Sequence, residues 1–354
     1  MKPIRDWFHQ TFSDPQVLIL TCVLLIAVAG IIFVADMVAP VIAAIVIAFL
    51  LDGLVQWLKQ RGIGHLVAVN TVFVGFLLAS LLFLLVLMPI IFSQTGEFVA
   101  QLPQLTQELQ GHLLALPEEY PDLVTESQVR DLMAQMGSGV VEVAALMPSF
   151  AGASIVGLLT VIVYLILVLL LVFFMIKDKT KITAWVVSFL PRDRELTSTV
   201  WHEVNEQIYN YVRGKFWEIL IVGGVTYVVF AMLGVNFSIL LAVITGLSVL
   251  IPYVGAAAVT VPVAVVAFLQ HGTNWEFAYV VIAYGVIQAL DGNVLAPLLF
   301  SEVVDLHPVA IIVAILIFGG LWGLWGVFFA IPLATVVQAV LRAWPRSSVW
   351  RKPI

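Results

Sequence analysis

The chain has 354 residues, of which 62% are hydrophobic and 11% are charged, and its formal net charge is −6 at pH 7. A soluble globular domain carries about a quarter charged residues. So few charges cannot cover the surface of a soluble protein of this size, and the composition predicts a chain that mostly faces lipid. The one cysteine, Cys22, cannot form an internal disulfide, and no metal-ligand spacing surrounds it.

Apolar segments follow one another along the whole chain, and we therefore expect an all-α, polytopic integral membrane protein. The first segment is close to the ~20 residues that a helix needs to cross the ~30 Å hydrocarbon core, so we interpret it as a retained span rather than a signal peptide. The eight segments are 17–35, 37–55, 66–93, 152–176, 214–233, 236–269, 277–299 and 308–341.

These segments divide the chain into five predicted parts. They are N-terminal transmembrane helices (1–93), an external amphipathic helical cap (94–150), a fourth span with a cytoplasmic amphipathic helix (151–213), a C-terminal transmembrane core (214–341) and a cytoplasmic tail (342–354).

The distribution of charge predicts the orientation. Only Arg130, of 16 Lys and Arg residues, lies in the stretch 93–148, which holds eight Asp and Glu residues. Loops rich in Lys and Arg stay in the cytoplasm. We therefore expect a bacterial inner (cytoplasmic) membrane protein with 93–148 outside and both termini in the cytoplasm. The other cations are Lys2, Arg5, Lys59, Arg61, Lys177, Lys179, Lys181, Arg192, Arg194, Arg213, Lys215, Arg342, Arg346, Arg351 and Lys352.

Two polar stretches show the periodicity of amphipathic helices. In the external cap, apolar residues recur at steps of three and four from Phe98 to Leu113, and we expect breaks at Pro117 and Pro121. A second stripe runs from Leu196 to Val212. Its basic ends and Trp201 predict a helix along the inner membrane face.

Two apolar segments do not resemble simple spans. In 236–269, two arms of 14 residues each, 237–250 and 256–269, are too short to cross and flank the sequence Ile251-Pro252-Tyr253-Val254-Gly255. Proline removes a backbone donor and glycine permits a positive φ, so we expect a break there. The segment 308–341 is interrupted in the same way by a glycine-rich stretch, 319–326.

Two topologies satisfy the charges. Either all eight segments cross, or 236–269 and 308–341 are re-entrant hairpins and six segments cross. The loops 271–276 and 301–307 carry no Lys or Arg and do not choose between them. The short arms favour the hairpins, which would enter from opposite sides as an inverted repeat, a common plan of secondary transporters. In the alternative, the glycines only allow close helix packing.

Polar residues at bilayer depth are costly and tend to mark function. Asp291 ends an apolar run beside Gln288 and Asn293, where the three side chains could meet a solute or cation; the alternative is a capped helix break at an interface. The candidate residues of the transport path are Gln288, Asp291, Asn293, Pro252, Gly255, Gly320, Gly323 and Gly326.

Other charged groups have simpler interpretations. Glu302, Asp305 and His307 form either a surface loop or a gate or proton relay. Arg213 and Lys215 are interpreted as cytoplasmic anchors, with Glu218 close enough to Lys215 for an i, i+3 pair.

Signatures of enzymes and of ATP-driven pumps are missing. There is no H-E-x-x-H, no G-x-x-x-x-G-K-[ST] and no Cys/His cluster. We expect no enzyme activity, no cofactor and no metal site. The expected partners are membrane lipid and a small polar solute or cation, and no nucleic acid.

Several stretches resemble the autoinducer-2 exporter-like family, in the same order and over nearly the whole chain. They are Asn210 to Lys215, Ile251 to Gly255, Gln288 to Asn293, Leu306 to Pro308 and Gly319 to Ala334. The resemblance implies a membrane transporter that forms homo-oligomers, with a pentamer as the expected state. It also implies export of a small polar solute, as members are linked to autoinducer-2 export and others to sodium–proton antiport.

We therefore expect a permease or exporter that is not driven by ATP. The alternatives are a sodium–proton antiporter and, from another class, a non-transporting membrane scaffold that uses its external cap.

Overall fold

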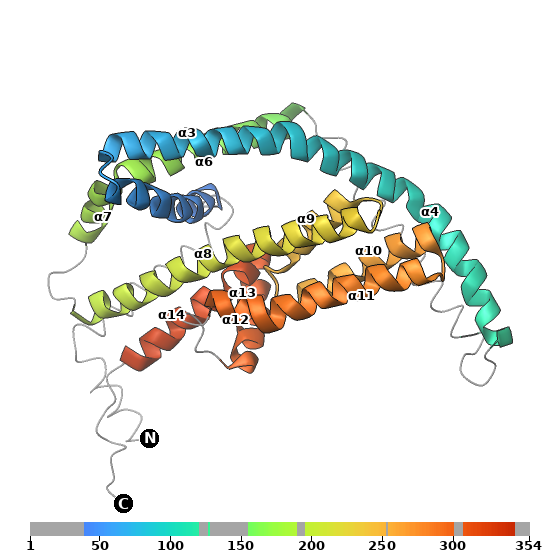
Figure 1. The fold of residues 1–354 in the computed structure, drawn as a ribbon. Coiled ribbons are helices and arrows are strands. Elements are labelled where there is room, and N and C mark those ends of the chain that lie inside the picture. Colours follow the sequence, from blue (N-terminus) through green and yellow to red (C-terminus); the bar gives the residue numbers. More distant parts are fainter. Residues whose placement is uncertain are drawn as a thin grey trace, which may run out of the picture. The chain divides into compact units, whose positions relative to one another are not determined.

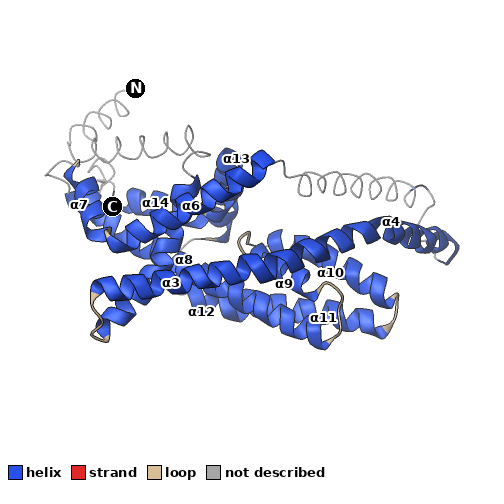
Figure 2. Ribbon diagram, turned by 90° about the horizontal axis from the view of Figure 1, so that it is seen from above, coloured by secondary structure: helices blue, strands red, loops and turns tan. Residues whose placement is uncertain are grey.

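The computed structural model describes residues 39–119, 127, 155–189, 195–252, 254–300 and 307–343. Every regular element in these ranges is a helix, which confirms the all-α prediction for this part of the chain (Figures 1 and 2). A helix over Ala39–Gln60 comes first. It is followed by α3 (His65–Leu82), η1 (Phe83–Leu87), α4 (Met88–Glu119), α6 (Ile155–Lys177), α7 (Lys179–Ser188), α8 (Glu195–Met232), α9 (Ser238–Ser248), α10 (Val254–His271), α11 (Trp275–Leu290), η2 (Asp291–Leu295), α12 (Ala296–Phe300), α13 (Pro308–Phe328) and α14 (Ala330–Ala343).

Within the described ranges, five helices are long and apolar enough to cross a membrane. They are Ala39–Gln60, His65–Gln104, Asn205–Met232, Val254–His271 and Trp275–Phe300. The predicted segment 17–35 lies outside the described residues, and α6 covers most of the segment 152–176.

The chain folds as two compact units. The first comprises 1–74, 165–218 and 294–354, and the second comprises 75–164 and 219–293. Each unit has a small apolar core that joins segments distant in sequence.

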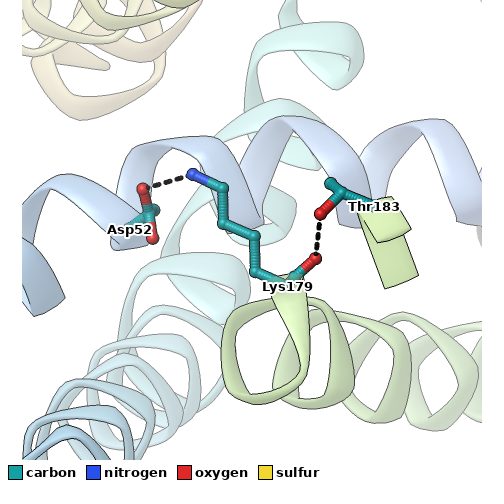
Figure 3. A network of polar contacts seen from close by, with 3 residues as sticks. All are labelled: Asp52, Lys179 and Thr183. Atoms are coloured by element: carbon teal, nitrogen blue, oxygen red, sulfur yellow. Dashed lines mark hydrogen bonds and ion pairs between the residues drawn. The ribbon is translucent and has the colours of Figure 1, made fainter. Parts of the chain in front are cut away.

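In the first unit, a polar junction joins the Ala39–Gln60 helix to α7. Asp52 Oδ2 accepts a hydrogen bond from Lys179 Nζ at 2.9 Å, and the Lys179 carbonyl accepts one from Thr183 Oγ1 at 2.8 Å (Figure 3). Beside it, Lys181 binds Asp178 at 2.9 Å, and this hydrogen bond holds the pKa of the Asp178 carboxyl below its usual value. Exposed pairs of this kind contribute little to stability, so they position the elements more than they stabilise them.

The helix α8 is one continuous element of 38 residues. It contains both the predicted amphipathic helix and the predicted span that begins at 214, so the helix has no break at the predicted boundary. Gly214 lies inside this helix and makes room for Phe300, because a Cβ at this position would lie 2.6 Å from the Phe300 ring.

In the second unit, α9, α10 and α11 pack in sequence, as both ribbon views show (Figures 1 and 2). Their core includes Phe230, Leu241, Val263, Val280 and Tyr284, all at most 2% exposed. The helices α8 and α9 cross where two glycines meet, since a Cβ on Gly246 would lie 2.8 Å from the Ile219 carbonyl oxygen and 3.2 Å from the Gly223 Cα. Small residues at such crossings let helix backbones approach closely.

Within the second unit, α4 packs against the start of α9. Gln94 Oε1 accepts a hydrogen bond from the Leu240 amide at 2.9 Å, and the rings of Phe98 and Phe237 meet edge to face with centroids 5.8 Å apart. The helix continues through Pro117 to Glu119, so the break predicted at Pro117 is wrong. The break predicted at Pro121 lies outside the described residues.

Candidate functional site

The segment 236–269 folds back on itself in the second unit. Gln270 closes the base of this first hairpin, because its Oε1 accepts from the Asn236 amide at 2.8 Å and its Nε2 donates to the Gly234 carbonyl at 2.6 Å. The arms α9 and α10 pack against each other. The two ends of the segment are therefore neighbours.

The tip of the first hairpin lies at the predicted break. The helix α9 ends at Ser248 and α10 begins at Val254, with Pro252 between them. Gly255 lies inside α10 without a positive φ, so the predicted reason for this glycine is wrong. A Cβ on Gly255 would overlap the carbonyl oxygen of Ser248, and the missing side chain is what lets the arms meet.

The lengths of the arms differ from the prediction of 14 residues each. The helix α9 has 11 residues and spans about 16 Å, whereas α10 has 18 residues and spans about 27 Å, at 1.5 Å per residue. Only α9 is too short to cross the ~30 Å hydrocarbon core. The hairpin interpretation consequently rests on the closed base more than on arm length.

The segment 308–341 forms the second hairpin, in the first unit. Its outgoing arm is the part of α13 before Gly323, and its return arm is the rest of α13 together with α14. Gly323 has φ 57° and ψ −137°, and this non-helical residue divides α13 before α14 begins. A Cβ on Gly326 would overlap the Phe318 carbonyl oxygen. Gly323 and Gly326 therefore each have a structural reason, whereas a Cβ on Gly320 would meet nothing within 4 Å.

The two hairpins share one local packing arrangement. In each, a glycine early in the return arm lies against a backbone carbonyl near the end of the outgoing arm, as Gly255 does with Ser248 and Gly326 with Phe318. A proline follows in each return arm, Pro262 in α10 and Pro332 in α14.

Gln288, Asp291 and Asn293 lie on the uninterrupted helix Trp275–Phe300. Asp291 opens the π turn η2, where Asn293 Nδ2 donates to the Ala289 carbonyl at 2.8 Å. The helix continues through Asp291, so the capped helix break is not what the structure contains. Wide turns of this kind occur frequently at functional sites.

Tyr284 connects this polar group to the first hairpin. Its hydroxyl donates to the Ala256 carbonyl at 2.8 Å, beside the tip glycine Gly255. Gln288 follows Tyr284 by one helical turn on α11. Tyr284 therefore lies next to the tip of the first hairpin, and Gln288 lies one turn further along the same helix.

The structure separates the two predicted anchors. Arg213 is exposed, whereas the Lys215 side chain is 7% exposed and lies 2.6 Å from Glu218 Oε2, in a pair whose carboxylate is 4% exposed. The predicted i, i+3 pair is confirmed. Lys215 Nζ also lies 5.1 Å from the Phe300 ring centroid. A buried ion pair is costly to desolvate, so a surface anchor does not explain Lys215.

Tyr211 contacts Phe300, as Lys215 does, and the sequence did not lead us to predict it as a site residue. It is 2% exposed, its ring lies 5.8 Å from that of Phe300, and its hydroxyl donates to the Phe328 carbonyl at 3.3 Å. Its place beside Gly214 and Lys215 in one of the matching stretches was the available signal.

The third predicted group is only partly described. His307 is the N-cap of α13, where its Nδ1 accepts from the Val309 amide at 3.2 Å. Glu302 and Asp305 lie outside the described residues, so the proposed gate or relay stays a prediction. Among the residues that the structure describes, no group of three His, Cys, Asp or Glu side chains is placed to hold a metal ion.

Long apolar helices, a broken and closed hairpin, and polar groups held within the helices define a multi-pass helical membrane protein. The sequence model described as AI-2E family transporter matches residues 21–346, and the chain belongs to this family.

Relatives match along most of their length. The chain is 42% identical to the "Putative permease PerM" of Escherichia coli (strain K12), over 99% of both chains. It is 26% identical to the "Putative transport protein YrrI" of Bacillus subtilis (strain 168), over 85% of each chain. It is also 26% identical to the "Putative transport protein sll0063" of Synechocystis, over 85% of this chain and 76% of that protein.

Proposed function

We propose that this protein is a permease or exporter that moves a small polar solute across the bacterial inner membrane without ATP. The observation that carries the proposal is the first hairpin, whose ends are joined by Gln270 and whose tip is broken beside Gly255. Irregular backbone at membrane depth is tolerated only where protein buries it or water reaches it. A broken hairpin that enters and leaves on one side supplies such a place.

The topology that fits this proposal has six crossings. The first hairpin enters from outside and the second from the cytoplasm, and the two would form an inverted repeat. Both termini then lie in the cytoplasm, in accord with the charge distribution. We also propose that the chain forms homo-oligomers, with the pentamer implied by the family resemblance as the expected state.

The polar lining of the path would come from Gln288, Asp291 and Asn293. Tyr284, one helical turn before Gln288, holds α11 next to the first tip through its bond to the Ala256 carbonyl. Asp291 places a carboxylate within this π turn. Ionisable side chains within transmembrane segments are costly and tend to mark substrate or ion pathways.

Asp291→Asn tests this role, because the amide keeps the size and much of the hydrogen bonding but cannot ionise. We expect flux in proteoliposomes to fall by at least about tenfold, equivalent to ~1.4 kcal/mol, with folding unchanged. The matched control is Glu276→Gln, an exposed acid in the first turn of α11. Wild-type flux from well-folded Asp291→Asn protein would remove Asp291 from the path.

A sodium–proton antiporter is the second candidate, and the buried Lys215–Glu218 pair favours it. Ionisable groups inside a membrane bundle often mark ion pathways. The two candidates differ in vesicles: an antiporter moves protons against sodium, whereas a permease moves a polar solute without that coupling. Absence of any flux would support the scaffold instead.

A further inference from the structure

A small pocket lies at the base of the first hairpin, at the opposite end from the tip. Its volume is about 110 Å³, and it lies wholly within the second unit. Four carboxamides and three apolar side chains line it: Gln101, Gln104, Asn236 and Gln270, with Phe237, Val266 and Leu269. No charged side chain is among these seven residues.

The pocket is built by fixed groups. The side-chain amide of Gln270 is hydrogen-bonded at both its oxygen and its nitrogen, to the backbone of Asn236 and of Gly234. Phe237 has φ 56° and ψ 26°, a left-handed conformation that is costly for a residue with a side chain, by about 1–3 kcal/mol. Phe237 is 9% exposed, and its ring packs against that of Phe98 in α4. Strain of this kind gathers at ligand-binding positions.

The chemistry of the lining selects a class of ligand. A carboxamide both donates and accepts hydrogen bonds and carries no charge. An ion would lose hydration here without gaining an opposite charge, which is unfavourable. The four carboxamides and the three apolar side chains together offer hydrogen bonds and apolar contact to one small molecule, and small-molecule sites combine the same two kinds of group.

We infer that this pocket binds a small uncharged solute with hydroxyl groups on one face and an apolar face on the other. On the predicted topology the pocket opens to the outside, so it would be an outer solute-binding site of the transport path. This role rests on the proposed function. Binding itself does not depend on transport.

The test is saturation-transfer NMR on the full-length protein in nanodiscs, with glycerol, erythritol and xylitol as neutral probes and sodium acetate as the charged one. We expect transfer to at least one neutral probe. The variant Gln101→Met/Gln104→Met should weaken that binding by about tenfold, since each hydrogen bond contributes about 0.5–1.5 kcal/mol. Gln107→Met is the matched control, because Gln107 is an exposed glutamine of α4 that does not line the pocket.

Two results would overturn the inference. One is that no neutral probe gives a signal that depends on Gln101 and Gln104. The other is that acetate shows the same dependence. Glutamine-dependent binding without any flux would keep the pocket and remove the transport proposal, whereas flux without such binding would do the reverse.

Discussion

Glu218→Gln is expected to lower the free energy of unfolding by about 3–5 kcal/mol, the usual cost of removing one partner from a buried ion pair. The reason is that Lys215, only 5% exposed, would keep its charge inside the first unit without the carboxylate at 2.6 Å. The Phe300 ring, with its centroid 5.1 Å from Lys215 Nζ, stabilises a cation by roughly 2 kcal/mol when desolvated, which does not replace a full opposite charge. Unfolding by denaturant in detergent micelles measures the change.

Two further variants show whether the loss of stability comes from leaving a charge buried without its partner. The double variant Lys215→Met/Glu218→Leu should regain most of the stability, because apolar side chains of similar size avoid the desolvation of both charges. Asp178→Asn breaks an exposed pair of the same i, i+3 spacing, with Lys181, and should change stability little. If Lys215→Met/Glu218→Leu were less stable than Glu218→Gln, burial of an unpaired charge would not be the cause.

Gly255→Ala and Gly326→Ala are expected to destabilise the protein and to abolish flux. In each case the new Cβ would overlap a backbone carbonyl oxygen, of Ser248 or of Phe318, and a backbone group cannot rotate away as a side chain does. Overpacking of this kind costs about 1–3 kcal/mol or more. Alanine is a better helix former than glycine by about 1 kcal/mol, which is too little to reverse the sign.

Gly320→Ala is the control for the hairpin tips. A Cβ at this position meets nothing within 4 Å, so the helix preference should dominate and stability should stay equal or rise by up to about 1 kcal/mol. Thermal unfolding and flux of the three variants measure the difference. Equal behaviour of Gly255→Ala and Gly320→Ala would show that the close approach at the tip does not hold the hairpin together.

Composition and apolar periodicity were sufficient to predict an all-helical membrane chain and a break near Pro252. The i, i+3 pair of Lys215 and Glu218 was also readable, because helical spacing alone brings such residues together. These features depend on neighbours in sequence.

Features that depend on distant contacts were not readable. Inside α8, the ring of Phe300 packs on Gly214, and nothing in the sequence relates these two residues. The pocket gathers glutamines from α4 and α10, which no periodicity relates.

We propose that the segment 236–269 enters and leaves the membrane on one side, and the accessibility of Asn236 and Asn274 to a thiol reagent tests this topology. Each is exposed, and each is changed to Cys in a Cys22→Ser background, with Gln107→Cys as the external control and Gln60→Cys as the cytoplasmic one. A membrane-impermeant maleimide added to intact cells should label positions 236, 274 and 107 and leave 60 unlabelled. Labelling of 236 and 274 from opposite sides would establish that the segment crosses, and would remove both the re-entrant hairpin and the inverted repeat.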